Sequence, residues 1–225
     1  MKKHLVFLSG AGMSAESGIS TFRDSNGLWE NHSIEDVATP QGFAKNPQLV
    51  LDFYNARRKQ LFEVEPNPGH QLIAELEKEY EVSVVTQNVD DLHERAGSSS
   101  VLHLHGELRK VQSSQNSSLI YKWEKDLNIG DNCVNGSQLR PHIVWFGEAV
   151  PAMEEAIEIV QSADVVVVIG TSLQVYPAAG LMDYAPDNCR VFYIDPNPSI
   201  SSTNKLTVIP KVASEGMKEL IEKHL

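Results

Sequence analysis

Short apolar runs rich in β-branched residues recur along the chain, each bounded by Gly, Asn or Asp. They lie at 5–8, 82–85, 143–146, 165–169 and 191–194. Near-continuous apolar runs are typical of strands in a parallel sheet that is covered on both faces. Between them, apolar residues recur at helical spacing over 68–79, 153–161 and 214–223. This alternation predicts an α/β fold with a doubly wound parallel sheet.

Two stretches interrupt the alternation. Residues 31–65 have a helical pattern, and residues 109–140 are polar and irregular, rich in Ser, Asn and Gln. We interpret both as insertions that form a smaller lobe beside the sheet. The chain is then a single domain of residues 1–225, with a larger part at about 1–30, 66–108 and 141–225 and the smaller lobe at about 31–65 and 109–140.

Charge and hydropathy narrow the choice of partners and compartment. The 225 residues include 19 Lys and Arg against 30 Asp and Glu, a formal net charge of −11. This charge has the wrong sign for neutralising phosphates, so we expect no nucleic-acid partner. No apolar run approaches the roughly 20 residues that cross a bilayer, and the run before Gly10 is too short for a signal peptide. We therefore expect a cytoplasmic protein with no membrane partner.

A glycine-rich segment follows the first predicted strand. Gly10, Ala11, Gly12 and Ser14 lie at its carboxyl end, where backbone N–H groups can approach a pyrophosphate closely. The spacing is G-x-G-x5-G and not the usual G-x-G-x-x-G, so a tight strand-to-helix turn is the alternative. The Arg23 side chain that follows could reach a phosphate or a ribose.

Polar residues also end three other predicted strands. They are Gln87, Asn88 and Asp90 after 82–85, Gly170, Thr171 and Ser172 after 165–169, and Asp195 and Asn197 after 191–194. The carboxyl ends of parallel strands form the edge where ligands bind in such sheets. Two amides and a carboxylate could hold an amide-bearing ring and a ribose, whereas a helix N-cap would explain only one of the three. An acid after a strand is the customary partner of a ribose diol.

Two histidines, His103 and His105, stand two positions apart before Gly106. Strand alternation places them on one side. We assign His103 to an ordinary structural role and His105, beside a glycine that permits close approach, to the site. A metal-binding histidine pair is the alternative, but no suitable third ligand lies nearby in the sequence.

Five blocks resemble the sirtuins, a family of NAD-dependent protein-lysine deacylases. They are G-A-G-x-S-x-x-S-G-I-x-x-F-R at 10–23, T-Q-N-x-D-x-L-H at 86–93, H-G at 105–106, P-H-I-V-W-F-G-E at 141–148 and G-T-S-L at 170–173. The resemblance implies a Rossmann-like domain with a smaller lobe and a cleft that holds NAD and an acyl-lysine protein or peptide. It implies an enzyme that removes acetyl, and succinyl or malonyl, groups to give nicotinamide, O-acyl-ADP-ribose and free lysine.

The resemblance also implies residue roles. His105 would be the general base, acting with Asn88, and an imidazole suits this role because its unperturbed pKa of about 6.5 lies near working pH. Phe22 would shield the sugar from water. The residues expected to bind NAD are Gly10, Ala11, Gly12, Ser14, Glu16, Phe22, Arg23, Gln87, Asn88, Asp90, Gly170, Thr171, Ser172, Asp195, Asn197 and Ala213. The peptide groove would comprise Val144, Phe146, Gly147 and Glu148.

The chain departs from the sirtuin pattern in its cysteines. Sirtuins normally hold a structural zinc with two C-x-x-C pairs in the smaller lobe. Here residues 111–115 read Val-Gln-Ser-Ser-Gln, the second region keeps only Cys133, and the other cysteine of the chain is Cys189. These residues cannot supply four thiolates. We therefore expect no zinc and no other metal site, with Cys133 an inert remnant.

A second departure is Tyr54-Asn55-Ala56-Arg57, which is similar to the Tyr-x-x-Arg of sirtuins that prefer succinyl-, malonyl- or glutaryl-lysine. Residues three apart share a helical face, so Tyr54 and Arg57 could converge on the distal carboxylate of an acyl chain. The alternative is a core tyrosine beside a solvated arginine.

Three other functions compete. An ADP-ribosyltransferase or NAD glycohydrolase would use the same pocket without an acyl-lysine, and Tyr54 and Arg57 argue against it. A non-catalytic NAD-binding module is disfavoured by the intact Asn88, Asp90 and His105. A hydride-transferring dehydrogenase is disfavoured because no second substrate lobe for a hydride acceptor is evident.

Overall fold

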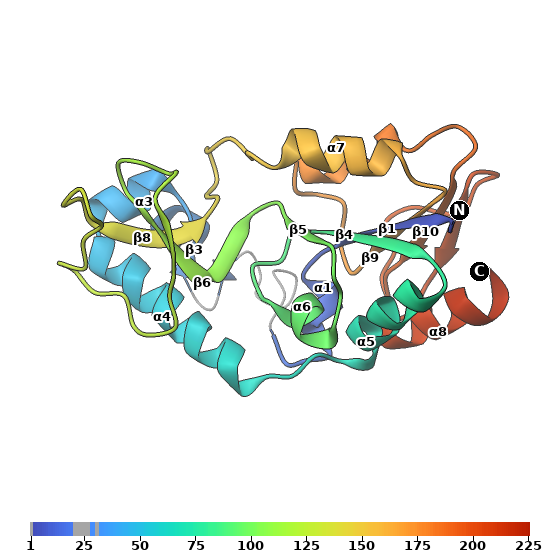
Figure 1. Ribbon diagram of the computed structural model, residues 1–225, viewed down its shortest axis with the longest axis horizontal. Helices are drawn as coiled ribbons and strands as arrows, with labels where there is room; N and C mark the ends of the chain where they lie inside the picture. Colours follow the sequence, from blue (N-terminus) through green and yellow to red (C-terminus); the bar gives the residue numbers. More distant parts are fainter. Residues whose placement is uncertain (1, 20–27, 30–31) are drawn as a thin grey trace.

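The computed structural model describes residues 2–19, 28–29 and 32–225, and its main feature is a six-stranded parallel sheet (Figure 1). The strand order is β11-β10-β9-β1-β4-β5. The chain winds outward from β1 through β4 to β5 and then returns to place β9 on the other side of β1. The doubly wound parallel sheet is thus confirmed. Its strands are β1 His4–Ser9, β4 Glu81–Thr86, β5 Val101–His103, β9 Val165–Ile169, β10 Arg190–Ile194 and β11 Leu206–Ile209.

Helices cover both faces of this sheet. Leu5 and Phe7 of β1 pack into one apolar cluster with residues of α5 and α8, and Val6 and Leu8 pack into a second cluster with residues of α7. Figure 1 shows α7 on one side of the sheet and α5 and α8 on the other. Burial on both faces explains why these strands read as continuous apolar runs. The covering helices are α5 Pro68–Glu75, followed by the 3-10 turn η2 Leu76–Lys78, α7 Met153–Gln161 and α8 Ala213–Lys223.

A three-stranded antiparallel sheet lies at the opposite end of the molecule, beside a group of helices (Figure 1). Its order is β7-β6-β8, and a separate antiparallel pair of β2 and β3 directly precedes α2 in the sequence. These elements are β2 Leu28–Trp29, β3 His32–Ser33, α2 Ile34–Val37, α3 Pro40–Lys45, α4 Pro47–Glu63, β6 Gly106–Ser113, β7 Ile120–Lys122 and β8 Leu139–Ile143. Three short helices complete the description: α1 Gly12–Ala15, α6 Leu92–Ala96 and η3 Ala178–Tyr184.

The prediction that 143–146 forms a strand of the parallel sheet is wrong. The strand there, β8, ends at Ile143 and pairs antiparallel with β6. Ile143 and Trp145 are buried in a cluster with Tyr54 of α4. A short apolar run shows that a segment is buried, but not which sheet or helix buries it.

Two polar side chains of α4 hydrogen-bond to other parts of the smaller sheet's region: Asn55 to the long segment between β7 and β8, and Arg58 to β6. The Asn55 amide donates to the Leu127 carbonyl at 3.0 Å and accepts from the Leu127 N–H at 2.9 Å. Arg58 donates from Nε to the Leu108 carbonyl at 2.8 Å and from Nη1 to the Asn55 oxygen at 2.9 Å. Buried backbone groups need such partners, and these bonds hold an otherwise irregular segment against the helix.

The length and apolar character of every helix within the described residues fall short of what crossing a membrane requires.

Candidate NAD-binding and catalytic site

Two backbone turns meet at the point where the strand order reverses, between β1 and β9. The N–H of Gly12 donates to the carbonyl of Gly170 at 2.7 Å, and the N–H of Gly10 donates to Ile169 at 3.0 Å. A Cβ added at Gly170, whose φ is +63°, would lie 2.2 Å from the Met13 nitrogen. No side chain fits here, so the approach of the two turns requires glycine. Ligands bind at this switch point in doubly wound sheets.

Ser14 of α1, Asn88 and Asp90 form a buried polar cluster beside this contact. The Asn88 amide donates to the Gly10 carbonyl at 3.1 Å and to the Ser14 hydroxyl at 3.0 Å. Ser14 donates in turn to Asp90 at 2.9 Å. Burial raises the pKa of Asp90, although the Leu92 N–H and the Ser14 hydroxyl oppose the rise. The Leu92 N–H donates to Asp90 at 3.2 Å, so Asp90 also supports the start of α6, although the N-cap residue of this helix is Asp91.

His105 lies between the loop after β4 and the segment after β8. Its Nδ1 is 3.1 Å from the carbonyl of Gln87, and its own carbonyl accepts from the Val144 N–H at 3.0 Å. A carbonyl only accepts, so Nδ1 carries the proton and Nε2 remains the basic nitrogen. Burial lowers the pKa of His105, against the opposing effect of the Gln87 bond. The neutral imidazole is therefore the dominant form near pH 7.

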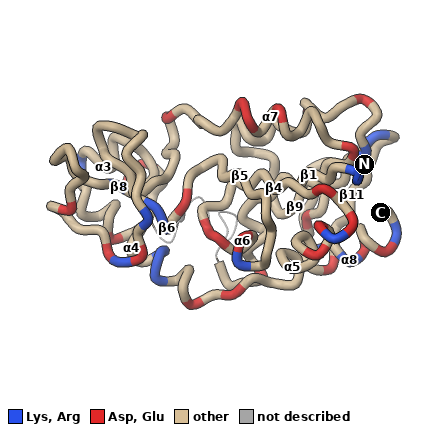
Figure 2. Tube along the Cα trace, viewed as in Figure 1, with Lys and Arg blue, Asp and Glu red and all other residues tan. Residues whose placement is uncertain are grey.

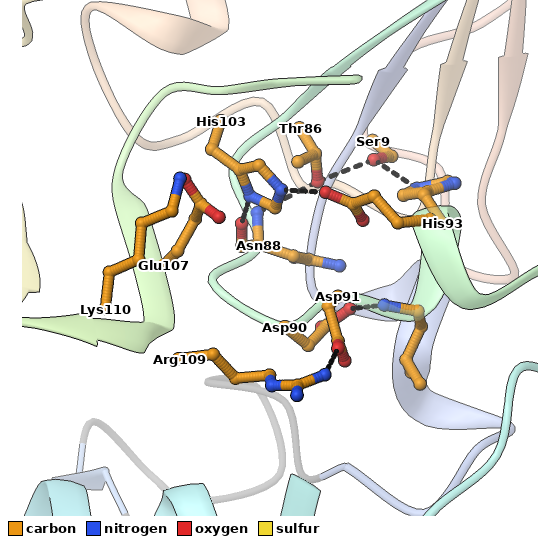
Figure 3. Close-up of polar contacts among 12 residues, drawn as sticks. Ser9, Thr86, Asn88, Asp90, Asp91, His93, His103, Glu107, Arg109 and Lys110 are labelled. Atoms are coloured by element: carbon orange, nitrogen blue, oxygen red, sulfur yellow. Dashed lines mark hydrogen bonds and ion pairs between the residues drawn. The ribbon is translucent and has the colours of Figure 1, made fainter. Parts of the chain in front are cut away.

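His103 contacts the same loop as His105, although the sequence predicted only an ordinary structural role for it. Its Nδ1 is 2.9 Å from the Asn88 carbonyl and its Nε2 is 2.8 Å from Glu94 (Figure 3). The two histidines thus hold consecutive carbonyls of one loop. The sequence contains one feature that could have indicated this contact, namely a glutamate in L-H-E at 92–94 that can pair with a histidine of H-L-H at 103–105.

The polar residues after β9 and β10 continue the same edge. Thr171 accepts from the Gln87 side chain at 3.3 Å, which joins the turn after β9 to the loop after β4. Ser172 follows it and is half-buried. Asp195 is buried and accepts from the N–H of Asn197 at 2.8 Å, so its carboxylate shapes the turn after β10.

Glu16 and Ala213 lie where α1 meets the start of α8. The Glu16 carboxylate accepts from the Ser214 N–H at 2.9 Å and from the Ser214 hydroxyl at 2.6 Å. These two bonds hold the Glu16 carboxylate at the first turn of α8, next to the buried Ala213. An acid at a helix start satisfies N–H groups that have no partner within the helix.

The expected peptide-groove residues follow β8. Phe146 is 45% exposed and Val144 is half-buried, and the Phe146 N–H donates to Ala38 at 2.9 Å. Gly147 has a φ of +91° and open space around its Cα. Glu148 turns inward and accepts from Arg140, at 2.7 and 2.9 Å. Glu148 thus fixes the turn, whereas Phe146 and Gly147 face outward.

Tyr54 and Arg57 occupy one side of α4. Tyr54 is fully buried, and its hydroxyl accepts from the Trp145 indole at 3.1 Å. The Arg57 guanidinium lies 5.7 Å from the Phe53 ring and lines a cavity of about 460 Å³. Tyr54 does not line this cavity; its other lining residues are His32, Leu49, Asp52, Phe53, Ala56 and Gln60. Figure 2 shows both Lys or Arg positions and Asp or Glu positions along α4.

The region around Cys133 is held by hydrogen bonds. The hydroxyls of Ser113 and Ser137 are 2.6 Å apart, and the Ser137 hydroxyl is 3.0 Å from the Cys133 sulfur. The Ser137 contact lowers the pKa of this buried thiol to about 7. One thiol and two hydroxyls do not make the four-ligand set of a structural zinc. Nowhere in the part of the chain that the structure describes do three or more His, Cys, Asp or Glu side chains gather as a metal site would require.

Two of the expected cofactor residues, Phe22 and Arg23, lie outside the described residues. Sequence reasoning also missed Ser9 and Thr86, whose hydroxyls hydrogen-bond at 2.8 Å beneath the Asn88 loop. Thr86 stands in the T-Q-N block, but Ser9 carries no motif signal of its own, since only the pairing of β1 with β4 brings the two together.

Comparison with known proteins identifies the family of this chain. Residues 10–177 match the model of the Sir2 family. An NAD-dependent protein deacylase of Helicobacter pylori (strain ATCC 700392 / 26695) is 58% identical over 222 residues, covering 98% of this chain and 97% of the relative. One of Bacteroides thetaiotaomicron is 58% identical over 225 residues, covering 97% and 96%. A solved Sir2 homolog–NAD complex is 41% identical, covers 98% of this chain and 89% of its own, and superposes with a TM-score of 0.87. The resemblance to the sirtuins is thereby confirmed, and this chain belongs to the Sir2 family.

Proposed function

We propose that this chain is an NAD-dependent protein-lysine deacylase. The observation that carries the proposal is the meeting of three features at one switch point: the Gly12–Gly170 contact, the Asn88 amide and the neutral His105 imidazole. Glycines at a strand end suit a pyrophosphate, and a basic imidazole suits proton transfer at neutral pH. The relatives from Helicobacter and Bacteroides named above are NAD-dependent protein deacylases.

The residues at the switch point fit NAD. Gly10 and Gly12 leave the backbone uncovered where a side chain would collide with the turn after β9, which suits the phosphates. Asn88 and Asp90 offer an amide and a buried carboxyl for the nicotinamide carboxamide. Thr171, Ser172, Asp195 and Asn197, with Gln87, Ala11, Ser14, Glu16 and Ala213, would surround the rest of the dinucleotide. NAD, when bound, supplies the ribose carbon from which nicotinamide departs.

His105 is the general base in this proposal. Its Nδ1–H is held by the Gln87 carbonyl, which orients the ring and leaves Nε2 as the acceptor for a proton from a ribose hydroxyl. The lowered pKa keeps Nε2 unprotonated near pH 7, so no energy is spent on removing a proton first. With that proton held on Nε2, the ribose oxygen would be able to take the acyl group from the lysine, and one water would be consumed as the lysine is released as the free amine.

The peptide would bind along the segment after β8. Val144 is hydrogen-bonded to the carbonyl of His105, so a lysine lying on this segment would be near the base. An extended substrate can add as a strand to exposed backbone, with the chain between Phe146 and Gly147 as the edge. Glu148 supports this edge through Arg140 without facing outward.

The acyl preference extends the proposal to malonyl- and succinyl-lysine. Arg57 lines a cavity large enough for a short acyl chain, and a largely buried guanidinium is stabilised by a carboxylate that it can bind in bidentate fashion. Tyr54, held by Trp145, stands one helical turn away on the same face. Asp52 also lines the cavity, but its side chain is exposed and accepts from Gln48 at 2.8 Å, so it opposes an acidic acyl group only weakly.

The domain organisation and compartment complete the proposal. The whole of 1–225 forms one catalytic domain, and the elements from α2 to α4 together with β6, β7 and β8 form its smaller lobe. Both cysteines, Cys133 and Cys189, are buried free thiols, which fits a reducing cytoplasm.

One experiment tests the function. The protein is incubated with NAD and matched acetyl-, malonyl- and succinyl-lysine peptides, and the products are followed by mass spectrometry. The expected products are free lysine peptide, nicotinamide and O-acyl-ADP-ribose in equal amounts, with higher kcat/KM for the acidic acyl groups. NAD consumption that does not depend on peptide would identify a glycohydrolase. Attachment of ADP-ribose to protein would identify a transferase, and NAD binding without turnover would identify a non-catalytic module.

A further inference from the structure

The backbone N–H and the backbone carbonyl of Asn88 are each bound by a side chain, and each of these side chains is connected through hydrogen bonds to a residue of α6 (Figure 3). The Asn88 carbonyl is bound by His103, and the Asn88 N–H by the hydroxyl of Thr86, at 2.9 and 3.0 Å respectively. The peptide that carries the nicotinamide-pocket amide is therefore fixed on two sides.

On the carbonyl side, His103 bridges Asn88 and Glu94. The Asn88 carbonyl and the Glu94 carboxylate both only accept, so His103 donates from both ring nitrogens and is an imidazolium. Burial opposes this charge, but the Glu94 hydrogen bond and charge and the Asn88 carbonyl outweigh burial and raise the pKa of His103. The His103 side chain is only 8% exposed, so competition from water is small.

On the N–H side, a chain of hydroxyls leads to His93. Thr86 accepts from the Asn88 N–H and, at 2.8 Å, from the hydroxyl of Ser9. Ser9 lies 3.0 Å from Nε2 of His93, and because Ser9 donates to Thr86, His93 donates to Ser9. Burial lowers the pKa of His93 well below its ordinary value, so this second histidine is neutral.

The two chains start from adjacent residues, His93 and Glu94, of the five-residue helix α6. We propose that α6 acts as a clamp on the Asn88 peptide, and that His103 and Glu94 are positioning residues for the nicotinamide end of NAD. The inference rests on the proposed function for the identity of the ligand. Without the clamp the Asn88 peptide can shift, and the Asn88 side-chain amide, which donates to Gly10 and Ser14, loses its fixed position at the site.

The clamp acts on one end of the dinucleotide only. Gly10, Gly12 and Gly170 are fixed by backbone bonds of their own, and neither His103 nor Glu94 contacts them. The Glu94 side chain is 39% exposed, so its ion pair with His103 contributes little to stability, and replacing these two side chains by apolar ones should cost little. Loss of His103 and Glu94 should therefore impair nicotinamide recognition while sparing the fold and the binding of ADP-ribose.

The test compares His103→Leu, Glu94→Leu, the double variant and His103→Gln with the unmutated protein. Binding of nicotinamide and of ADP-ribose is measured separately by calorimetry without peptide, alongside the melting temperature and KM for NAD. We expect each Leu variant to weaken nicotinamide binding and raise KM for NAD roughly tenfold, as for the loss of one charge-assisted bond, with ADP-ribose affinity within about twofold. The double variant should be no worse than either single one, because both residues act through one contact. His103→Gln, which keeps one donor for Asn88, should restore part of the loss.

Lys110→Met is the matched control. Lys110 pairs with Glu107 at 2.5 Å beside His103, and no bond joins this pair to Asn88 (Figure 3). It should leave both affinities unchanged. Equal losses of nicotinamide and ADP-ribose binding, additive effects in the double variant, or unchanged nicotinamide binding would each overturn the clamp. Unmutated protein that binds both ligands yet fails to deacylate any peptide would instead overturn the proposed function, and the binding ratios of the variants would still decide the clamp.

Discussion

The indole N–H of Trp145 donates to the hydroxyl of Tyr54 over 3.1 Å, which joins the segment after β8 to helix α4. Trp145 also lies under the Arg140 guanidinium, 3.5 Å from it, and Arg140 binds Glu148. The proposed peptide edge and the proposed acyl pocket are thus parts of one packed network. A substrate that orders the edge should help to hold Tyr54 in place.

Arg57→Met should damage removal of acidic acyl groups selectively. A charge-assisted contact with a carboxylate contributes roughly 1.5 to 3 kcal/mol, so kcat/KM on succinyl-lysine should fall about 10- to 100-fold. Deacetylation makes no such contact and should change little. The control is Lys59→Met, two residues further along α4, where the Lys59 side chain is 75% exposed. Equal losses on both substrates would indicate that Arg57 supports the fold and not the acyl preference.

His105→Ala should lower kcat by about 10²- to 10⁴-fold, because the general base is lost. The melting temperature should stay nearly unchanged, because the substitution removes no contact of the apolar core. The kcat/KM of the unmutated enzyme should decrease only below pH 6.5. Activity is lost when Nε2 becomes protonated and can no longer accept a proton, and the lowered pKa of His105 moves this protonation to lower pH. His224→Ala, at the far end of α8, is the control. Full activity of His105→Ala would rule out the general-base assignment.

Gly170→Ala should destabilise the protein far more than Gly136→Ala. Both glycines have positive φ, +63° and +81°, so both variants bear backbone strain of about 1–2 kcal/mol. Only at Gly170 would the new Cβ meet backbone, 2.2 Å from the Met13 nitrogen, whereas nothing lies within 4 Å at Gly136. Urea unfolding measures the difference, and similar losses at the two sites would contradict the close contact at the switch point.

The purified protein should contain far less than one zinc per chain. Ser113, Cys133 and Ser137 satisfy one another by hydrogen bonds, and one thiol is too few for a structural site. Metal analysis by mass spectrometry and melting curves with and without a chelator check this. About one bound zinc, or a melting temperature lowered by the chelator, would show that the prediction is wrong.

Stability should fall as pH drops from about 6.5 to 4, in part because of His70. Burial lowers the pKa of His70 to about 4, whereas the unfolded chain titrates near 6.5. Between these values the unfolded state binds a proton that the folded state does not, so stability decreases with falling pH, by up to about 3 kcal/mol. In urea unfolding at several pH values, His70→Gln should show a shallower decrease than the unmutated protein. An unchanged slope would exclude His70 as a source.

The strands and helices of the parallel sheet were determined by local pattern. The predicted runs 165–169 and 153–161 coincide with β9 and α7, because burial on both faces demands continuous apolar strands and amphipathic helices between them. The blocks at 10–23 and 86–93 likewise identified the family, since the polar ends of parallel strands are local in sequence. Strand β11 was missed, because three of its four residues are only partly buried and the hydrophobic pattern is weak.

Only the tertiary structure determined the hydrogen-bond partners of the polar side chains. Glu16 reaches Ser214, 198 positions away, and Ser9 meets Thr86 and His93 only because β1 pairs with β4. The sequence determined that 143–146 is buried, but packing against α4 decided that it leaves the parallel sheet. A side chain's hydrogen-bond partner depends on which strands become neighbours. That is settled by the burial of the whole sheet, so no local stretch of sequence encodes it.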